Sequence, residues 1–239
     1  LKIDGRKIIL TFEKGKFVLG ATRGDGEVGE DVTVNARTIE SIPLSLKEKV
    51  SMIAVGEVWI GKKDLEKINK QREKEGEALY ANTRNLAAGS MRQLDPKMTA
   101  SRKLNAFIYD IDELDIGIPE TQSKEINYLK SLGFGVNPHF EVFDSLDGVE
   151  KFYKKWALKK DKLDYGLDGI VIKINSRKIQ EALGYTGKSP RWGVAYKFPA
   201  EQVTTVVEDI VLQVGRTGVL TPVAHLRPVL VAGSNVSRA

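Results

Sequence analysis

Cysteine is absent from the chain, which excludes disulfides and thiolate zinc sites within these 239 residues. Histidine is scarce as well: His139 and His225 are the only two, and neither has a set of ligand residues beside it, so we do not interpret them as metal ligands. No apolar run reaches membrane-spanning length, and no signal peptide is recognisable. We therefore expect a cytoplasmic protein without a membrane partner.

The composition that is present suits a folded, moderately basic protein. Apolar residues make up 41% of the chain and charged residues 29%, which allows a sizeable core and a well-solvated surface. The length suffices for one large domain, or for one domain and part of another. A net charge of +5 favours an anionic partner such as nucleic acid, although many ordinary enzymes carry as much. Because the first residue is leucine rather than methionine, we expect a segment of a longer protein.

The spacing of apolar residues predicts strands and helices mixed along the chain. A β-hairpin is expected first, with Gly15 in its turn. Apolar residues alternate with polar ones on both of its strands: Ile8, Leu10 and Phe12 on the first, and Phe17, Leu19 and Ala21 on the second. The other predicted strands are 52–60, 104–111, 168–175 and 192–199, and the predicted helices are 62–75, 121–132 and 146–157, with a helical turn at 32–39 and a loop or short helix at 81–95.

The pattern of apolar and turn-forming residues changes near residue 200. Short apolar stretches at 203–207, 210–214 and 219–226 then alternate with Gly- and Pro-containing turns. This pattern is typical of a small β-barrel that begins and is cut short. We therefore predict one domain over residues 1–200 and the beginning of a second over residues 201–239.

Two of the predicted strands carry a lysine on the face that has little side-chain bulk. In residues 168–174, Lys173 shares its face with a glycine and a valine, and in residues 192–198, Lys197 shares its face with a glycine and an alanine. The bulky faces should seek the core, so the two ammonium groups are expected to stand in one cleft where a ligand fits. Either lysine alone is better explained as an ordinary edge residue, but the repeated pattern reverses that preference.

Glu57 and Lys2 can each be explained either by a structural role or by a functional one. Glu57 shares a strand face with three apolar residues and therefore needs a partner, which is either a structural salt bridge or a ligand hydroxyl or metal. Lys2 precedes Asp4 at the entry to a strand. A lysine becomes a nucleophile when desolvation or nearby cations make its amine neutral, but Lys2 taken alone is better explained as a fraying terminal residue.

Arg84 and Arg92 lie in a polar stretch, residues 81–93, that also contains asparagine, serine and glutamine. Such a set is typical of a surface that contacts the phosphates of a nucleic acid. A solvated helix face explains the stretch equally well.

An ordered series of motifs runs through almost the whole chain. It resembles the nucleotidyltransferase domain of bacterial NAD-dependent DNA ligases, continuing into the start of their OB-fold. The Gly-Arg-Thr-Gly turn distinguishes this family from ATP-dependent ligases and capping enzymes. The motifs are Lys2-Ile3-Asp4-Gly5, residues 21–26, residues 55–58, residues 84–96, Asp168-Gly169-Ile170-Val171-Ile172-Lys173, residues 190–200, Gly215-Arg216-Thr217-Gly218 and Thr221-Pro222-Val223-Ala224.

The resemblance implies a fold and a set of catalytic roles. The fold would be α+β, a nucleotidyltransferase (ATP-grasp-like ligase) domain with antiparallel sheets followed by a truncated OB-fold β-barrel. Lys2 would become linked to AMP, and Asp4 and Glu57 would contact the ribose or a metal. Asp168 would support the site electrostatically, and Glu57 and Asp168 are the candidate metal ligands.

The remaining roles concern phosphates. By the same resemblance, Arg23 and Lys173 would hold the nucleotide and its phosphates, and Lys197 would reach the α-phosphate. Arg84 and Arg92 would grip the nicked strand. The cofactors implied are NAD and Mg²⁺, the partner is nicked duplex DNA, and the protein is expected to be a monomer.

The implied activity is the sealing of DNA nicks in replication and repair, through a lysyl-AMP intermediate and an adenylated 5′-phosphate. Two alternatives remain: a nucleic-acid-binding fragment without catalysis, and an ATP-dependent nucleotidyltransferase. The family's nicotinamide-binding domain, zinc module, helix-hairpin-helix region and BRCT domain have no counterpart here, so Zn²⁺ is expected only outside this segment and the segment alone is expected to be inactive with NAD. Lys160 and Thr83 stand where the family has arginine and proline.

Overall fold

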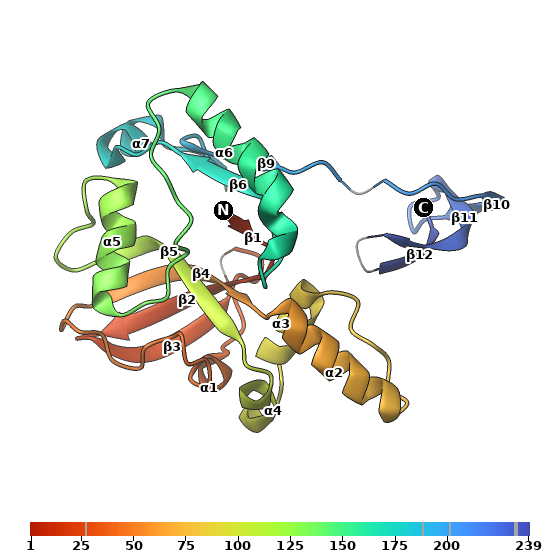
Figure 1. Ribbon diagram of the computed structural model, residues 1–239, viewed down its shortest axis with the longest axis horizontal. Helices are drawn as coiled ribbons and strands as arrows, with labels where there is room; N and C mark the ends of the chain where they lie inside the picture. The colour runs from red at the N-terminus through yellow and green to blue at the C-terminus, as the bar shows by residue number, and fades with distance from the viewer. Residues whose placement is uncertain (27, 188, 201, 232–233) are drawn as a thin grey trace.

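A computed structural model describes residues 1–26, 28–187, 189–200, 202–231 and 234–239 (Figure 1). Helices and strands are mixed, and every pair of strands in the described residues is antiparallel. This confirms the α+β class with antiparallel sheets.

The strands are β1 Lys2–Ile3, β2 Arg6–Glu13, β3 Lys16–Thr22, β4 Met52–Trp59, β5 Asn105–Leu114, β6 Leu167–Lys173, β7 Tyr185–Thr186, β8 Ser189–Pro190, β9 Gly193–Lys197, β10 Val207–Val214, β11 Leu220–Val231 and β12 Ser234–Arg238. The helices are α1 Thr33–Ala36, α2 Lys62–Lys74, α3 Thr83–Met91, α4 Pro96–Ser101, α5 Gln122–Leu132, α6 Leu146–Lys159, the 3₁₀ turn η1 Lys160–Lys162 and α7 Arg177–Leu183.

A four-stranded sheet, in the order β3-β2-β4-β5, forms the lower part of the molecule in Figure 1. The predicted hairpin of β2 and β3 is confirmed, with Gly15 at a φ of +78° in its turn. The alternation expected for β3 is wrong, because the register shifts after Thr11 and leaves Leu19 40% exposed. A β-bulge of this kind moves the following side chains to the opposite face.

The larger core joins one face of this sheet to the helices around it. Side chains of β2 and β4 pack with apolar residues of α3 and α5 and of the segment around α1. Helix α5 begins where the Thr121 hydroxyl accepts a hydrogen bond from the Lys124 amide, and it ends at Gly133, whose φ is +106°. Both ends were thus predictable from residue type.

A three-stranded sheet, in the order β1-β6-β9, lies apart from the first (Figure 1). Helix α6 covers one of its faces, where Phe152 and Trp156 pack against Ile170 and Phe198 in a second, smaller core. The prediction that the bulky face of the 192–198 strand is buried is only partly right, because Val194 is 59% exposed. Strand β9 is the edge strand of its sheet, and it has a neighbouring strand on one side only.

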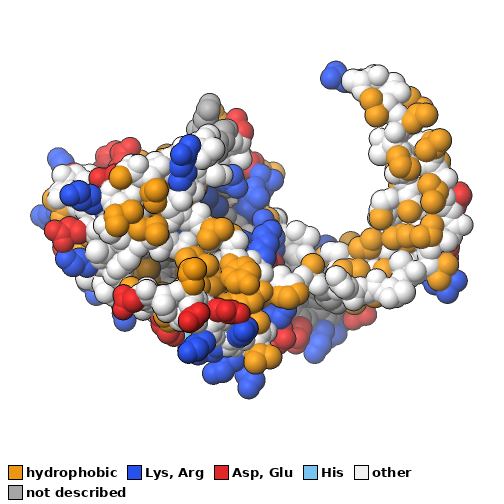
Figure 2. Space-filling view, turned by 90° about the horizontal axis from the view of Figure 1, so that it is seen from above, with side chains coloured by type: hydrophobic (Ala, Val, Ile, Leu, Met, Phe, Trp, Pro, Cys, Tyr) orange, Lys and Arg blue, Asp and Glu red, His pale blue; other side chains and the backbone are white. Residues whose placement is uncertain are grey.

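Strands β10, β11 and β12 form a third sheet, which projects from the rest on an extended connection (Figure 1). Apolar side chains are exposed along this arm in Figure 2, including Ile210, Leu212 and Val214. The strand predicted at 203–207 is wrong, because β10 begins only at Val207. Glu201, the first residue assigned to the second predicted domain, lies outside the described residues.

No helix in the described part of the chain is both long and apolar enough to cross a membrane.

Candidate active site

A cleft of about 790 Å³ opens between the four-stranded sheet and the β1-β6-β9 sheet. Its polar lining comes from segments that are far apart in the sequence. Five of the residues singled out from the sequence contribute to that lining: Lys2, Arg23, Glu57, Arg84 and Lys173.

In the β1-β6-β9 sheet, a glycine of the central strand lies between two lysines of the neighbouring strands. Gly169 of β6 pairs with Lys2 on one side and with Lys197 on the other. Directly opposed residues of antiparallel strands project to the same face, so the two lysines flank a position that has no side chain. Lys173, four residues further along β6, lies on this face as well and pairs with Gly193. Lys173 and Lys197 therefore share a face of the sheet, but Lys197 does not line the cleft, so the expectation that both ammonium groups stand in one cleft is not confirmed.

Gly169 permits the close approach of β6 and β9. A Cβ atom added at Gly169 would lie 2.3 Å from the carbonyl oxygen of Tyr196 and 2.6 Å from the Cα of Lys197. We therefore expect Gly169→Ala to push β9 aside and to lower the free energy of unfolding by about 1–3 kcal/mol, measured by urea denaturation. Gly193→Ala is the matched control on the same strand pair, since its nearest neighbours are 3.7 Å away, and it should change stability by less than about 0.5 kcal/mol. Equal effects of the two substitutions would contradict this explanation.

Carboxylates hold the first residues of the chain in place. The Lys2 ammonium lies 2.5 Å from Oδ2 of Asp168, and both side chains are about one-quarter exposed. Asp4 donates its backbone N–H to the carbonyl oxygen of Gly166 and accepts a hydrogen bond of 3.0 Å from Nη1 of Arg84. Arg84 is placed by the first turn of α3, where the side chain of Asn82 caps the helix. These contacts join Lys2 and Asp4 to β6, to the segment before it and to α3.

Glu57 projects from β4 into the cleft, on the face turned away from the larger core. Burial raises the pKa of its carboxyl group to about 7, although the positive charges of Arg84 and Lys2 oppose the shift. The salt bridge considered for Glu57 is not formed by any of the described residues. Gly5 makes room beside it, because a Cβ at Gly5 would lie 2.8 Å from the Cγ of Glu57. The glycine of the Lys-x-Asp-Gly motif therefore lets the first strands pass close to this carboxylate.

Lys173 is held by one carboxylate and two aromatic rings. Its ammonium lies 3.0 Å from Oδ2 of Asp110 on β5. It also lies 5.7 Å from the ring centre of Tyr109 and 5.5 Å from that of Trp192. The side chain of Lys173 is 19% exposed, so one side of the ammonium still reaches the cleft.

The other candidates lie at the margin of the cleft or away from it. Arg23 lines the cleft just after β3, whereas Lys197 and Asp168 stand beside it and Lys197 is exposed. Arg92, at the end of α3, is separate from the cleft and forms an ion pair of 2.6 Å with Glu30. The structure thus brings four of the five nucleotide-binding candidates to one cleft, places Lys197 beside it and leaves Arg92 on the surface.

The described residues offer a limited ligand set for a metal. No group of three or more His, Cys, Asp or Glu side chains converges among them. Mg²⁺ bound to a substrate phosphate, however, needs only one or two carboxylates and keeps several waters. The carboxylate of Glu57, which forms no ion pair with a described residue, and the partly exposed Asp168 fit that requirement.

Several residues of the site were missed in the sequence. Tyr109 lines the cleft and Asp110 pairs with Lys173, yet both belong to a segment interpreted only as a strand. Glu125 lies behind them on the buried face of α5, together with Leu129 and Leu132. A charged residue within an apolar helical stripe requires a partner, and that signal marks Glu125 in the sequence.

Comparison with known proteins assigns both parts of the chain. Residues 1–201 match the family model of the NAD-dependent DNA ligase adenylation domain, and residues 204–239 match that of the NAD-dependent DNA ligase OB-fold domain. The whole chain is 52% identical to a DNA ligase of Carboxydothermus hydrogenoformans, 53% identical to one of Halalkalibacterium halodurans and 48% identical to one of Clostridioides difficile.

The chain spans about a third of the length of these curated relatives: 36% of the first two and 35% of the third. The match to the adenylation-domain model covers most of the chain, and the order of the motifs agrees with it. The chain therefore belongs to the NAD-dependent DNA ligase family, with residues 1–201 similar to the adenylation domain of these enzymes and residues 204–239 similar to their OB-fold domain.

Proposed function

We propose that this chain provides the adenylation centre of an enzyme that seals nicks in duplex DNA with NAD as the source of AMP. The observation on which the proposal chiefly rests is the position of the Lys2 ammonium. It lies beside Asp168, in a cleft that Glu57 and Lys173 also line. That arrangement supports covalent attachment of AMP to Lys2, followed by its transfer to the DNA.

In the first step, the Lys2 amine attacks the α-phosphorus of NAD, forming a P–N bond while the bond to nicotinamide mononucleotide breaks. The amine must first lose a proton, and Oδ2 of Asp168 is the atom within reach to accept it. Lys173, and Lys197 from beside the cleft, would neutralise charge on the phosphate as it is attacked. Catalysis at phosphorus consists mostly of such positioning and charge neutralisation.

Glu57 and Asp168 are the residues that would hold Mg²⁺. When bound, the ion would neutralise part of the negative charge on the phosphates. Asp4 and Arg23 would orient the ribose and the phosphates.

In the later steps the AMP passes from Lys2 to the 5′-phosphate of the nick, and the 3′-hydroxyl then displaces AMP and joins the strands. Arg84 and Arg92 would hold the nicked strand. In the structure Arg84 is paired with Asp4 and Arg92 with Glu30. Phosphates of the DNA would replace these carboxylates as partners of the two arginines. Basic side chains gather on the flank of the main body that faces the β10–β12 arm (Figure 2), which supports a duplex between them.

The finer features of the fold and setting belong to the same proposal. Residues 1–200 would form the nucleotidyltransferase domain, with its ATP-grasp-like arrangement, and residues 201–239 the beginning of an OB-fold barrel. The protein would act as a cytoplasmic monomer in DNA replication and repair, and any Zn²⁺ would be bound outside these residues.

Nick sealing tests the proposal directly. The complete gene product that includes residues 1–239 should join a nicked duplex when supplied with NAD and Mg²⁺, and should fail when ATP replaces NAD. Sealing with ATP alone would instead support an ATP-dependent nucleotidyltransferase. Binding of the nicked duplex without any sealing would support a non-catalytic clamp.

Residues 1–239 in isolation should not adenylate themselves from NAD. Expulsion of nicotinamide mononucleotide requires that half of the cofactor to be held in line with the attacking amine, and the family resemblance implies that another domain holds it. Incubation of the isolated chain with adenine-labelled NAD and Mg²⁺ measures this. Stoichiometric label on Lys2 would show that the adenylation domain suffices alone.

A further inference from the structure

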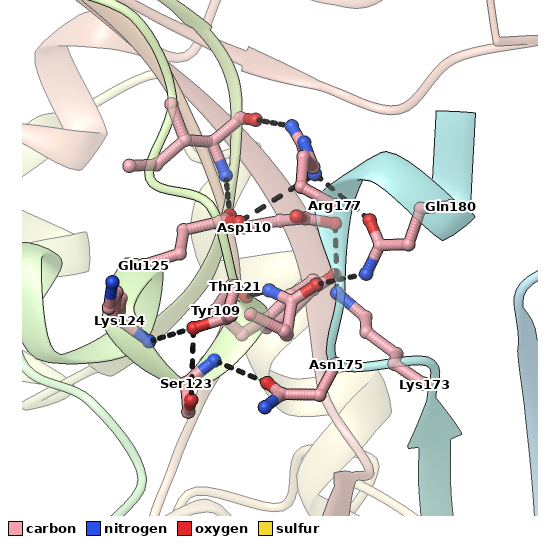
Figure 3. A network of polar contacts seen from close by, with 12 residues as sticks. Tyr109, Asp110, Thr121, Ser123, Lys124, Glu125, Lys173, Asn175, Arg177 and Gln180 are labelled. Atoms are coloured by element: carbon pink, nitrogen blue, oxygen red, sulfur yellow. Dashed lines mark hydrogen bonds and ion pairs between the residues drawn. The ribbon is translucent and has the colours of Figure 1, made fainter. Parts of the chain in front are cut away.

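Behind Lys173 lies a buried polar cluster that the proposed chemistry does not use, composed of Asp110, Glu125, Arg177 and Gln180 (Figure 3). Asp110 is its link to the cleft, because its Oδ2 atom is 3.0 Å from the Lys173 ammonium. The two side chains are only 20% and 19% exposed. The position of the ammonium therefore depends on where the Asp110 carboxylate is held.

Glu125 holds the segment that carries Asp110. Its side chain is fully buried, and its Oε1 atom accepts a hydrogen bond of 2.6 Å from the backbone N–H of Ile111, the residue after Asp110. Its Oε2 atom is also buried and accepts no hydrogen bond from the described residues. The nearest cation is Nη1 of Arg177 at 3.6 Å, which is too far for a good hydrogen bond.

A proton on Glu125 explains this geometry. Two ionised carboxylates side by side in a buried position would repel each other, and an ionised Oε2 without a donor would be costly. A protonated Glu125 can instead donate a hydrogen bond to the neighbouring Asp110. Burial, together with the hydrogen bond and negative charge of Asp110, raises the pKa of Glu125 to about 8.

The cluster also lies where the two sheets of the cleft are joined. Between α5 and the segment after β6, the backbone N–H of Gln122 donates to the carbonyl oxygen of Asn175, and the N–H of Ser123 donates to its Oδ1. Nη2 of Arg177 reaches back across the junction to the carbonyl oxygen of Ile111. Glu125 thus contacts the strand that carries Asp110 and lies 3.6 Å from Arg177, which follows the strand that carries Lys173.

We propose that Glu125 is a positioning residue for adenylation: it fixes Asp110, and Asp110 fixes the Lys173 ammonium toward the α-phosphate. The inference rests on the proposed function, because it assigns Lys173 to the phosphate. The groups that face Glu125 are Asp110 from β5 and Arg177 from α7, with Lys173 of β6 beyond Asp110.

Two variants separate positioning from mere support of the fold. Glu125→Gln keeps the shape, the acceptor for Ile111 and a donor for Asp110, so adenylation from NAD should stay within about threefold of wild type. Glu125→Leu keeps a buried side chain of similar size but removes the acceptor for Ile111 and the donor for Asp110. The kcat of adenylation should therefore fall at least about tenfold while KM for NAD changes little. Glu120→Gln is the matched control, since the Glu120 side chain is exposed and pairs only with Lys124.

The pH profile gives a second readout. As pH rises past about 8, ionisation of Glu125 should break its hydrogen bond to Asp110 and slow adenylation, whereas the Gln variant lacks this ionisation and should show a flatter alkaline limb. The free energy of unfolding should also depend on the protonation of Glu125. The folded state keeps a proton on Glu125 that the unfolded chain loses above the ordinary glutamate pKa of 4.5. The stability of the wild type should therefore fall relative to that of Glu125→Gln between about pH 5 and pH 8.

The complete gene product, adenine-labelled NAD and Mg²⁺ are the materials for all of these measurements. A folded Glu125→Leu protein with wild-type kcat would overturn the inference, and so would a Gln variant as impaired as the Leu variant. Should Glu125→Leu fail to fold, superimposable pH profiles of wild type and Glu125→Gln would overturn it. Absence of label on the wild type would overturn the proposed function, and the inference with it.

Discussion

Replacement of Lys2 by alanine should abolish the AMP adduct in the complete gene product. Lys2 lies both opposite Gly169 and beside Asp168, whereas Lys197, on the other side of Gly169, forms no ion pair with a described residue. Lys2→Arg should be equally inactive, because a guanidinium stays protonated and cannot attack phosphorus. The measurement is the transfer of label from adenine-labelled NAD to the protein.

The control for this experiment is Lys16→Ala, at the turn of the β2–β3 hairpin, where the lysine is exposed and its ammonium donates a hydrogen bond to the hydroxyl of Ser45. It should be labelled like the wild type. An adduct that persists in Lys2→Ala, on any residue, would contradict the assignment of the nucleophile.

Substitution of methionine for Lys173 or Lys197 should slow adenylation by at least about a hundredfold each, the loss expected when one donor to a developing charge is removed. The effects on stability should differ. Lys197 is exposed and forms no ion pair with a described residue, so its loss should change the free energy of unfolding by less than about 1 kcal/mol. Loss of Lys173 leaves Asp110 unpaired and should cost about 1–3 kcal/mol.

Rates of labelling and urea denaturation curves of the two variants, measured side by side, provide the comparison. The assignment of Lys197 to phosphate chemistry would be reversed by a Lys197→Met protein that loses much of its stability but keeps its activity. Equal stability losses in both variants would contradict the structural role given to Asp110.

Local signals in the sequence predicted much of the fold. Gly15 and Gly133 mark a turn and a helix end because both adopt positive φ values, which are costly for other residues. Helix α4 was missed although Asp95 caps it and Pro96 starts it, because a six-residue helix shows little periodicity. The bulge in β3 was missed because register depends on the partner strand rather than on the strand itself.

The site was less predictable, because it is assembled from distant segments. Periodicity predicted which face of its own strand each of Lys173 and Lys197 takes, since that depends only on alternation along the strand. That the two faces coincide depends on the pairing of β6 with β9. The pairing of Lys2 with Gly169 joins residues at opposite ends of the adenylation region, and no local pattern contains it. The contact between Asp110 and Lys173 is likewise a product of how the two sheets meet.

The most direct test of this account is to locate the AMP on the protein. The complete gene product is incubated with NAD and Mg²⁺ and digested, and the adenylated peptide is sequenced by mass spectrometry. The account predicts one AMP per chain, on the Nζ atom of Lys2, released when nicked DNA is added. AMP on a different residue, or a wild-type protein that seals nicks without ever carrying AMP, would contradict it.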